Sequence, residues 1–228
     1  QMKRLGYKYK INEISTYDFK NLKRKNNTIN IINIEFKFKK VFDKISKKSN
    51  DYLKKCFDVG INLAKNNRVK ALINGPISKE NFLNKRFPGM TEYFAKKTNC
   101  SGKETMLIYN RNLSVSPLTT HLPLKKIFKE ISIKKLIKQI ETIHNFYKFK
   151  LSKIPIIGVT GLNPHCETTD KFSEDEKILR PAVNKLKNKG VKIEGPYAAD
   201  TIFLKNNIRK FDVIVGMYHD QVLTPIKT

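Results

Sequence analysis

The chain has 228 residues with a formal net charge of +26, and its hydrophobic fraction of 39% is enough for a buried core, which excludes a wholly disordered protein. Its 46 Lys and Arg are spread along the chain without an Arg-rich block, a pattern typical of solvated surfaces that predicts no nucleic-acid partner. No stretch approaches the roughly 20 apolar residues of a membrane helix, and three scattered cysteines exclude a disulfide framework, so we predict a cytoplasmic protein without a membrane partner.

The first part of the chain is predicted to form two strands and two helices. Residues 28–36 alternate loosely between polar and apolar side chains, which predicts a strand. From Ser49 onward, apolar residues recur every three or four positions, which predicts an amphipathic helix capped by Ser49 or Asp51. The apolar run 69–73 predicts a short strand, and a helix is expected to begin near Ser78.

From residue 113 onward, short apolar runs alternate with helical patterns. The runs predict four buried strands, at residues 113–118, 154–159, 191–193 and 213–215. The helical patterns begin at Ser132, at Ser173 with the S-x-x-E spacing of a capping box, and at Asp200 for a short helix over 200–206. Pro181 is expected to kink the second of these helices. This alternation is typical of βαβ units and predicts an α/β fold with a mostly parallel sheet covered by helices on both faces.

Three of the four histidines, His121, His165 and His219, come just after predicted strands. Because the carboxyl ends of parallel strands line one edge of a sheet, where ligands bind, these side chains could meet in space. Three neutral imidazoles suit a divalent ion such as Zn²⁺ and leave a position for substrate. Three loop histidines with ordinary hydrogen bonds are the alternative, and the spacing does not decide between the two. His144 lies within an amphipathic helix and is interpreted as a structural or surface residue.

Charged residues accompany these histidines. Asp220 directly follows His219, where a carboxylate could orient a metal-bound imidazole. Asp200 suits the same role and the role of a helix N-cap equally well. Lys227 could bind an anion, although a single lysine near a chain end usually has only a surface role.

Six short motifs follow one another along the chain: NGPISK (74–79), PGMTE (88–92), TTHLPL (119–124), LNPH (162–165), GPYAADT (195–201) and MYHDQ (217–221). Each motif is weak alone, but the six in this order are specific. Together they resemble the 4-hydroxythreonine-4-phosphate dehydrogenase family of pyridoxal phosphate biosynthesis, and the resemblance covers about residues 49–228.

This resemblance implies a two-lobed α/β/α fold like that of isocitrate and isopropylmalate dehydrogenases. Residues 1–88 would belong to the first lobe and residues 89–228 to the second lobe, which carries the histidine site. The resemblance also implies that the chain is truncated at both ends relative to the family. The enzyme is expected to be a homodimer with its active sites at the subunit interface.

The resemblance further implies the chemistry of the site. Such enzymes oxidise the 3-hydroxyl of 4-phosphooxy-L-threonine with NAD or NADP, decarboxylation follows, and a divalent metal (Zn, Mg or Co) assists. The matching residues are His121, His165 and His219 for the metal, Thr91 and Lys227 for the substrate, and Asp200 and Asp220 as acidic catalytic positions.

Met90 departs from the family pattern, which usually has a histidine at this position. A thioether cannot replace the hydrogen bonds of an imidazole. The alternative is therefore a related dehydrogenase of another phosphorylated hydroxy acid, such as threonate or erythronate 4-phosphate, or of a diol. A catalytically inactive binding protein of the same fold is a further alternative, suggested by the missing ends and by a loop at 166–171 that lacks the family's glycines.

Overall fold

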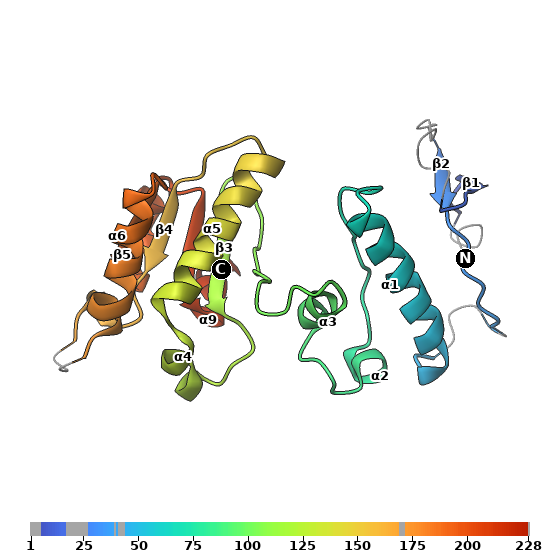
Figure 1. The fold of residues 1–228 in the computed structure, drawn as a ribbon, viewed down its shortest axis with the longest axis horizontal. Coiled ribbons are helices and arrows are strands. Elements are labelled where there is room, and N and C mark those ends of the chain that lie inside the picture. The colour runs from blue at the N-terminus through green and yellow to red at the C-terminus, as the bar shows by residue number, and fades with distance from the viewer. Residues whose placement is uncertain (1–5, 17–26, 39, 41–43, 169–171, 228) are drawn as a thin grey trace. The chain divides into compact units, whose positions relative to one another are not determined.

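The computed structural model of the chain describes residues 6–16, 27–38, 40, 44–168 and 172–227, so part of the loop at 166–171 lies outside the described residues (Figure 1). The chain divides into two compact units, Gln1–Ser101 and Gly102–Thr228. The lobes predicted at 1–88 and 89–228 stay a prediction about the complete fold.

In its described part, the first unit combines a small sheet with three α-helices. Strands β1 (Lys10–Glu13) and β2 (Thr28–Ile31) pair in parallel, and β2 lies within the predicted range 28–36. A 3-10 turn (Lys47–Ser49) leads into α1 (Asn50–Lys65), which is followed by α2 (Lys79–Leu83) and α3 (Met90–Lys97). Ser49 and Ser78 precede α1 and α2, as predicted, although neither side chain makes a capping hydrogen bond.

Aromatic side chains join the three helices of this unit. The ring centroid of Phe57 in α1 lies 5.4 Å from that of Phe82 in α2 and 5.8 Å from that of Tyr93 in α3. Such tilted and edge-on contacts are favourable for aromatic rings. Met90, at the start of α3, packs against this cluster, so its thioether contributes to the core of the unit.

The strand predicted at residues 69–73 is wrong. This segment has no regular secondary structure, and Leu72 and Ile73 are 38% and 91% exposed. A strand needs a neighbour to bond its backbone N–H and C=O groups. Within the described part of this unit, β1 and β2 pair only with each other. The apolar run therefore has no partner strand, which a sequence pattern cannot reveal.

The second unit is built on a four-stranded sheet. Its strands β3 (Ser114–Thr119), β4 (Ile157–Thr160), β5 (Ile193–Tyr197) and β6 (Val213–Tyr218) overlap the four predicted runs. They lie in the spatial order β3-β6-β4-β5, and all neighbouring strands are parallel. The predicted parallel sheet is confirmed, and the carboxyl ends of all four strands lie at one edge.

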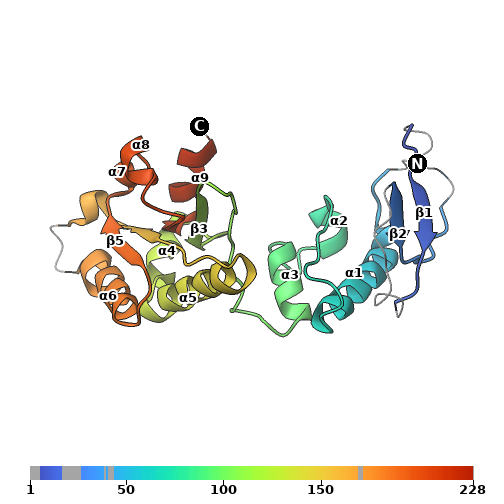
Figure 2. The same cartoon turned by 90° about the horizontal axis from the view of Figure 1, so that it is seen from above.

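Helices cover both faces of this sheet, as predicted (Figure 2). One face packs against α4 (Leu124–Glu130), α5 (Ile133–Lys150) and α6 (Arg180–Asn188), and the other against α7 (Ala199–Ile202), α8 (Lys205–Ile208) and α9 (His219–Lys227). The buried residues of β6 alternate between the faces: Val213 and Val215 join the first cluster, whereas Ile214 joins the second. The short helix predicted at 200–206 corresponds to two separate turns, α7 and α8.

Serine side chains cap two helices at the predicted places. The Ser132 hydroxyl accepts a hydrogen bond from the backbone N–H of Lys135, which confirms the predicted start of α5. The Ser173 hydroxyl likewise accepts one from Glu176, at the start of a π-helical turn (Asp175–Leu179) that continues as α6. Pro181 lies in the first turn of α6, directly after the π-helical turn, and has no N–H to donate to that turn. The irregularity expected at Pro181 therefore lies in the π-helical turn just before it.

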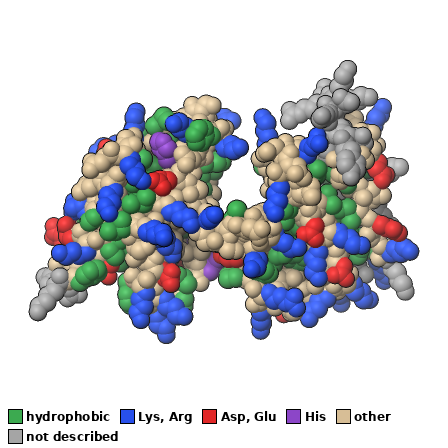
Figure 3. Space-filling view, in the orientation of Figure 1, with side chains coloured by type: hydrophobic (Ala, Val, Ile, Leu, Met, Phe, Trp, Pro, Cys, Tyr) green, Lys and Arg blue, Asp and Glu red, His purple; other side chains and the backbone are tan. Residues whose placement is uncertain are grey.

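Lysine and arginine side chains are scattered over the surface of each unit, as the face drawn in Figure 3 shows. On that face they form no continuous basic stripe of the kind that follows a nucleic-acid backbone. Among the described residues, no helix is long and apolar enough to cross a membrane.

Each outer strand of the sheet contains a proline, Pro117 in β3 and Pro196 in β5, whereas β4 and β6 contain none. On the outer side of β3, the N–H of Val115 bonds to the carbonyl of Ile108. Backbone groups alternate in direction along a strand, so Pro117, two residues later, lies where the next outward N–H would be. Proline has no N–H and is therefore tolerated at sheet edges.

Candidate functional site

The carboxyl ends of the four strands carry most of the predicted site residues. His121 follows β3, His165 lies in a 3-10 turn (Pro164–Cys166) after β4, and His219 is the first residue of α9 after β6. Asp200 lies in α7, after β5. Because the strands are parallel, all four residues belong to the same sheet edge, where ligands bind in open parallel sheets.

His165 lies close to the carboxylate of Asp200. The Nδ1 atom of His165 is 3.8 Å from the Oδ2 atom of Asp200, and the two side chains are 74% and 60% exposed. His165 and the following Cys166 both have positive φ angles, 54° and 62°. Residues other than glycine rarely adopt this left-handed conformation, and where they do the surrounding structure must hold them there. The backbone turn that carries His165 must therefore be held in this conformation by the structure around it.

His219 contacts the neighbouring carboxylate of Asp220. The Nδ1 atom of His219 lies 2.7 Å from the Oδ1 atom of Asp220. When Nδ1 carries the proton and donates it to this carboxylate, the second ring nitrogen, Nε2, is left as the ligand-binding atom. The pair thus sets both the tautomer and the direction of the imidazole.

Gln221 joins the ends of β4 and β6. Its Oε1 atom accepts hydrogen bonds from the Thr160 hydroxyl (2.8 Å) and the backbone N–H of Met217 (2.7 Å). Its Nε2 atom donates to the carbonyl of Gly161 (2.7 Å). The amide of Gln221 therefore connects the segment that leads to His165 with the strand that leads to His219.

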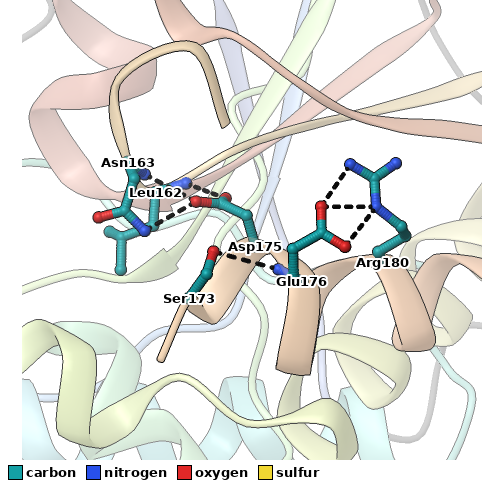
Figure 4. Close-up of polar contacts among 6 residues, drawn as sticks. All are labelled: Leu162, Asn163, Ser173, Asp175, Glu176 and Arg180. Carbon is teal, nitrogen blue, oxygen red and sulfur yellow. Dashed lines mark hydrogen bonds and ion pairs between the residues drawn. The ribbon is translucent and has the colours of Figure 1, made fainter. Parts of the chain in front are cut away.

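Asp175 lies beneath the loop after β4 (Figure 4). Its carboxylate is fully buried and accepts hydrogen bonds from the backbone N–H groups of Leu162 and Asn163. The side-chain amide of Asn163 donates a third bond to it. In the same view, the neighbouring Glu176 points away from this loop and pairs with Arg180.

The loop closes tightly over this carboxylate. A side chain on Gly161 would put its Cβ atom 2.5 Å from the sulfur of Cys166 and 2.8 Å from the Oδ1 atom of Asp175, so only glycine fits. Burial raises the pKa of the Cys166 thiol, and the nearby charge of Asp175 raises it further. Cys166 therefore packs as a protonated thiol inside the loop.

Tyr197 ends β5 beside this edge. Its hydroxyl donates a 2.6 Å hydrogen bond to the Oε2 atom of Glu194. This bond, together with partial burial, raises the pKa of Tyr197 to about 12. The phenol therefore stays neutral at physiological pH.

The remaining predicted residues are exposed. His121 and Asp220 lie on the surface of the second unit, and Lys227 is the last residue of α9. Thr91 is the second residue of α3, in the first unit. His121 and Lys227 therefore lie in the second unit, and Thr91 lies in the first.

The described residues contain no group of three His, Cys, Asp or Glu side chains close enough to hold a metal ion. The structure brings His165 together with Asp200 and His219 together with Asp220, and no third ligand joins either pair in that part of the chain. Each pair places a carboxylate beside Nδ1 of an imidazole, which is a common arrangement around histidines that bind metals. The three-histidine site stays a prediction.

Two residues of this region were missed by the sequence analysis. Gln221 follows His219 within the motif MYHDQ, which was the available signal. Asp175 lies within the sequence Ser-Glu-Asp-Glu, whose spacing indicated only a helix start. Neither pattern predicts contact with the loop after β4.

Comparisons with known proteins give the same family as the motifs. The model of the family described as pyridoxal phosphate biosynthetic protein PdxA matches residues 1–228. The 4-hydroxythreonine-4-phosphate dehydrogenase of Sulfurihydrogenibium sp. (strain YO3AOP1) is 37% identical over 165 residues, covering 70% of this chain and 50% of that protein. The D-threonate 4-phosphate dehydrogenase of Pectobacterium atrosepticum is 32% identical over 186 residues, covering 80% of this chain and 57% of that protein. The chain spans about half the length of the curated relatives it matches.

A solved structure shows the same fold. The crystal structure of a 4-hydroxythreonine-4-phosphate dehydrogenase from Burkholderia phymatum superposes with a TM-score of 0.81 at 28% identity, covering 99% of this chain and 69% of the other. This likeness confirms the predicted α/β fold of the isocitrate/isopropylmalate dehydrogenase type.

Proposed function

The chain belongs to the pyridoxal phosphate biosynthetic protein PdxA family, and from this membership we propose that the protein oxidises the 3-hydroxyl of 4-phosphooxy-L-threonine. NAD or NADP accepts the hydride, and the resulting 3-oxo acid then loses CO₂. The observation that carries the proposal is the placement of His121, His165 and His219 after the carboxyl ends of three parallel strands, each within a family motif. The proposal concerns the whole protein, of which this chain covers part.

The proposed roles follow from the chemistry of each side chain. Neutral imidazoles of His121, His165 and His219 hold a divalent cation (Zn, Mg or Co), which when bound supplies Lewis-acid stabilisation of negative charge on the substrate oxygen. Asp220 accepts a hydrogen bond from Nδ1 of His219, which leaves Nε2 of that ring for the ligand. Asp200 adds negative charge 3.8 Å from Nδ1 of His165.

The proposed substrate contacts involve one cation and one hydroxyl. The ammonium of Lys227 is a compact positive charge suited to the substrate phosphate. The hydroxyl of Thr91 can donate to a second polar group of the substrate. The hydride acceptor is a nicotinamide cofactor, which itself supplies the redox chemistry. We assign no residue of this chain to binding the cofactor.

We also place the active site at the subunit interface of a homodimer. In the described part of one chain, each of the pairs His165–Asp200 and His219–Asp220 lacks a third ligand. A ligand contributed by a second subunit would complete the site. The three cysteines are unpaired thiols, which supports a cytoplasmic location.

A second candidate function is the oxidation of D-threonate 4-phosphate or D-erythronate 4-phosphate. Met90 favours it, because this side chain packs against an apolar cluster and cannot make the hydrogen bonds of the histidine usual at this position. The similarity to the D-threonate 4-phosphate dehydrogenase of Pectobacterium atrosepticum supports the same alternative.

The test is a parallel assay of the three phosphorylated acids with NAD and with NADP, following the reduced nicotinamide. We expect 4-phosphooxy-L-threonine to be oxidised fastest, with activity lost after chelation and restored by Zn²⁺. His165→Ala and His219→Ala should abolish turnover, while His144→Gln serves as the matched control outside the site. Oxidation of D-threonate 4-phosphate alone would establish the second candidate. A protein that binds Zn²⁺ and oxidises none of the acids would contradict both, and one that binds no Zn²⁺ would favour an inactive binding protein.

A further inference from the structure

The two central strands, β4 and β6, separate before the outer pairs do at the carboxyl edge of the sheet. The ladder between β4 and β6 reaches Val159 and Val215. In contrast, β4 pairs with β5 up to Thr160, and β6 pairs with β3 up to Tyr218. The chain after β4 continues to α6 on one face, whereas the chain after β6 forms α9 on the opposite face. Such a reversal is the place at which ligands bind in open α/β sheets.

The side chain of Gln221 bridges the two strands just beyond the end of their ladder. Its Oε1 atom accepts hydrogen bonds from the backbone N–H of Met217 (2.7 Å) and from the Thr160 hydroxyl (2.8 Å). Its Nε2 atom donates to the carbonyl of Gly161 (2.7 Å). A side-chain amide offers the same kinds of donor and acceptor as a peptide group. Gln221 therefore replaces the backbone hydrogen bonds that the next residues of β4 and β6 do not make to each other.

The backbone around this bridge is closely fitted. A Cβ atom on Gly216 would collide with the side chain of Val222 and lie 3.1 Å from Oε1 of Gln221, so glycine lets the first turn of α9 lie directly on β6. The Thr119 hydroxyl donates a buried 2.7 Å hydrogen bond to the carbonyl of Met217. Side chains therefore hold both the N–H and the C=O of Met217, two residues before α9 begins.

We propose that Gln221 is a positioning residue for His219. His219 is the first residue of α9, and Gln221 lies two residues later in the same turn. Because the Gln221 amide bonds this turn to the ends of both β4 and β6, it fixes where the imidazole of His219 stands at the sheet edge. The inference rests on the proposed function only in assigning His219 to the metal, and it holds whichever subunit supplies the other ligands.

Gln139 offers a matched control. Its side chain is 8% exposed, and its amide bonds α5 to the middle of β3 by donating to the Ser116 hydroxyl (2.8 Å) and the Pro117 carbonyl (3.1 Å). Gln139→Met and Gln221→Met therefore each remove an amide that joins a helix to the sheet. Only Gln221→Met removes one at the ends of β4 and β6.

Zn²⁺ binding is measured by titration calorimetry on the full-length proteins, and kcat is measured over a range of Zn²⁺ concentrations. We expect both variants to lower the midpoint of urea unfolding, because each leaves hydrogen-bonding groups of the sheet without partners. Only Gln221→Met should bind Zn²⁺ more weakly, by about 10-fold, as when a group that orients a metal ligand is removed. Its kcat should recover at high Zn²⁺. Equal Zn²⁺ affinity in folded Gln221→Met and Gln139→Met would overturn the inference.

Thr160→Val provides a second, milder variant. It keeps the shape of the side chain and removes only the hydroxyl that donates to Gln221. We expect its Zn²⁺ affinity to fall about 2- to 5-fold, in line with the loss of one hydrogen bond. This variant decides the matter if Gln221→Met does not fold, and a Zn²⁺ affinity equal to that of the wild type would then overturn the inference.

Backbone hydrogen exchange separates this inference from the proposed function. Exchange at residues 160–162 and 217–221 should be faster in Gln221→Met than in Gln139→Met, with or without a bound metal. Unchanged exchange in folded Gln221→Met would refute the positioning role alone. A wild-type protein that binds no Zn²⁺ and oxidises none of the acids would refute the proposed function and, with it, the assignment of His219 to a metal.

Discussion

The Nδ1 atom of His165 and the Oδ2 atom of Asp200 lie 3.8 Å apart, although the two residues follow different strands, β4 and β5. Neighbouring parallel strands make this approach possible, because their carboxyl ends open at the same edge. Both side chains are more than half exposed, so the contact contributes little to folding. The effect of the His165–Asp200 contact is instead on the orientation of the His165 imidazole.

Replacing Asp200 by Asn should therefore affect metal binding more than stability. We expect Zn²⁺ affinity to fall about 10-fold in Asp200→Asn, because the negative charge beside the imidazole of His165 is lost. The midpoint of urea unfolding should change little. Glu141→Gln, which removes an exposed carboxylate paired with Lys189, is the matched control. Equal Zn²⁺ affinity in the two variants would contradict the assigned role of Asp200.

A methyl group at Gly161 should destabilise the second unit. Its Cβ atom would lie 2.5 Å from the Cys166 sulfur and 2.8 Å from a carboxylate oxygen of Asp175 that is already hydrogen bonded. We expect Gly161→Ala to lower the free energy of unfolding by about 1–3 kcal/mol, the range of overpacked sites, as measured by urea denaturation. Gly75→Ala, where no atom lies within 4 Å of the new Cβ, should change the value far less. Equal losses would show that the loop is not tightly closed.

The Tyr197 phenol should titrate later than an ordinary tyrosine. Its pKa is raised to about 12, mainly by the hydrogen bond to Glu194. A folded-state pKa above the unfolded value stabilises the protein fully below about pH 10, and this contribution is lost as the pH rises toward 12. The difference between the alkaline spectra of the wild type and Tyr197→Phe isolates this group. In Glu194→Gln the titration step of Tyr197 should move to lower pH. A step near pH 10 in the difference between the wild type and Tyr197→Phe would contradict the contact with Glu194.

Cys166 should react more slowly with thiol reagents than Cys100. Cys166 is buried and its pKa is raised by burial and by the charge of Asp175, whereas Cys100 is exposed. Because the thiolate is the reactive form, we expect a rate at least about 10-fold lower for Cys166 at pH 8. Variants that retain one cysteine each give the two rates separately. Similar rates would mean that the loop opens readily.

The sequence predicted those parts of the fold that depend on local signals. Ser132 identified the start of α5, because a serine followed by a regular apolar stripe is typical of a capped helix. The run Val213–Val215 identified β6, because consecutive β-branched residues favour a buried strand. The run at 69–73 had the same appearance, but its structure depends on a neighbouring strand.

The candidate site was predictable only in part for a related reason. The three histidines could be placed at one edge, because each follows its own strand in the chain. Gln221 and Asp175 act through contacts with residues 60 and 13 positions away in the sequence, Gly161 and Leu162. No local pattern encodes such contacts. The order of the strands within one chain also does not determine whether a third histidine lies near the two His–Asp pairs.

The prolines of the two outer strands have a consequence for solubility. Fibrils of the cross-β type grow when a strand offers an unbroken row of N–H and C=O groups to an incoming chain. Pro117 interrupts that row on the outward side of β3, and Pro196 removes a donor from β5. Among the described residues, the outward side of β3 therefore offers no unbroken row of donors to an incoming chain.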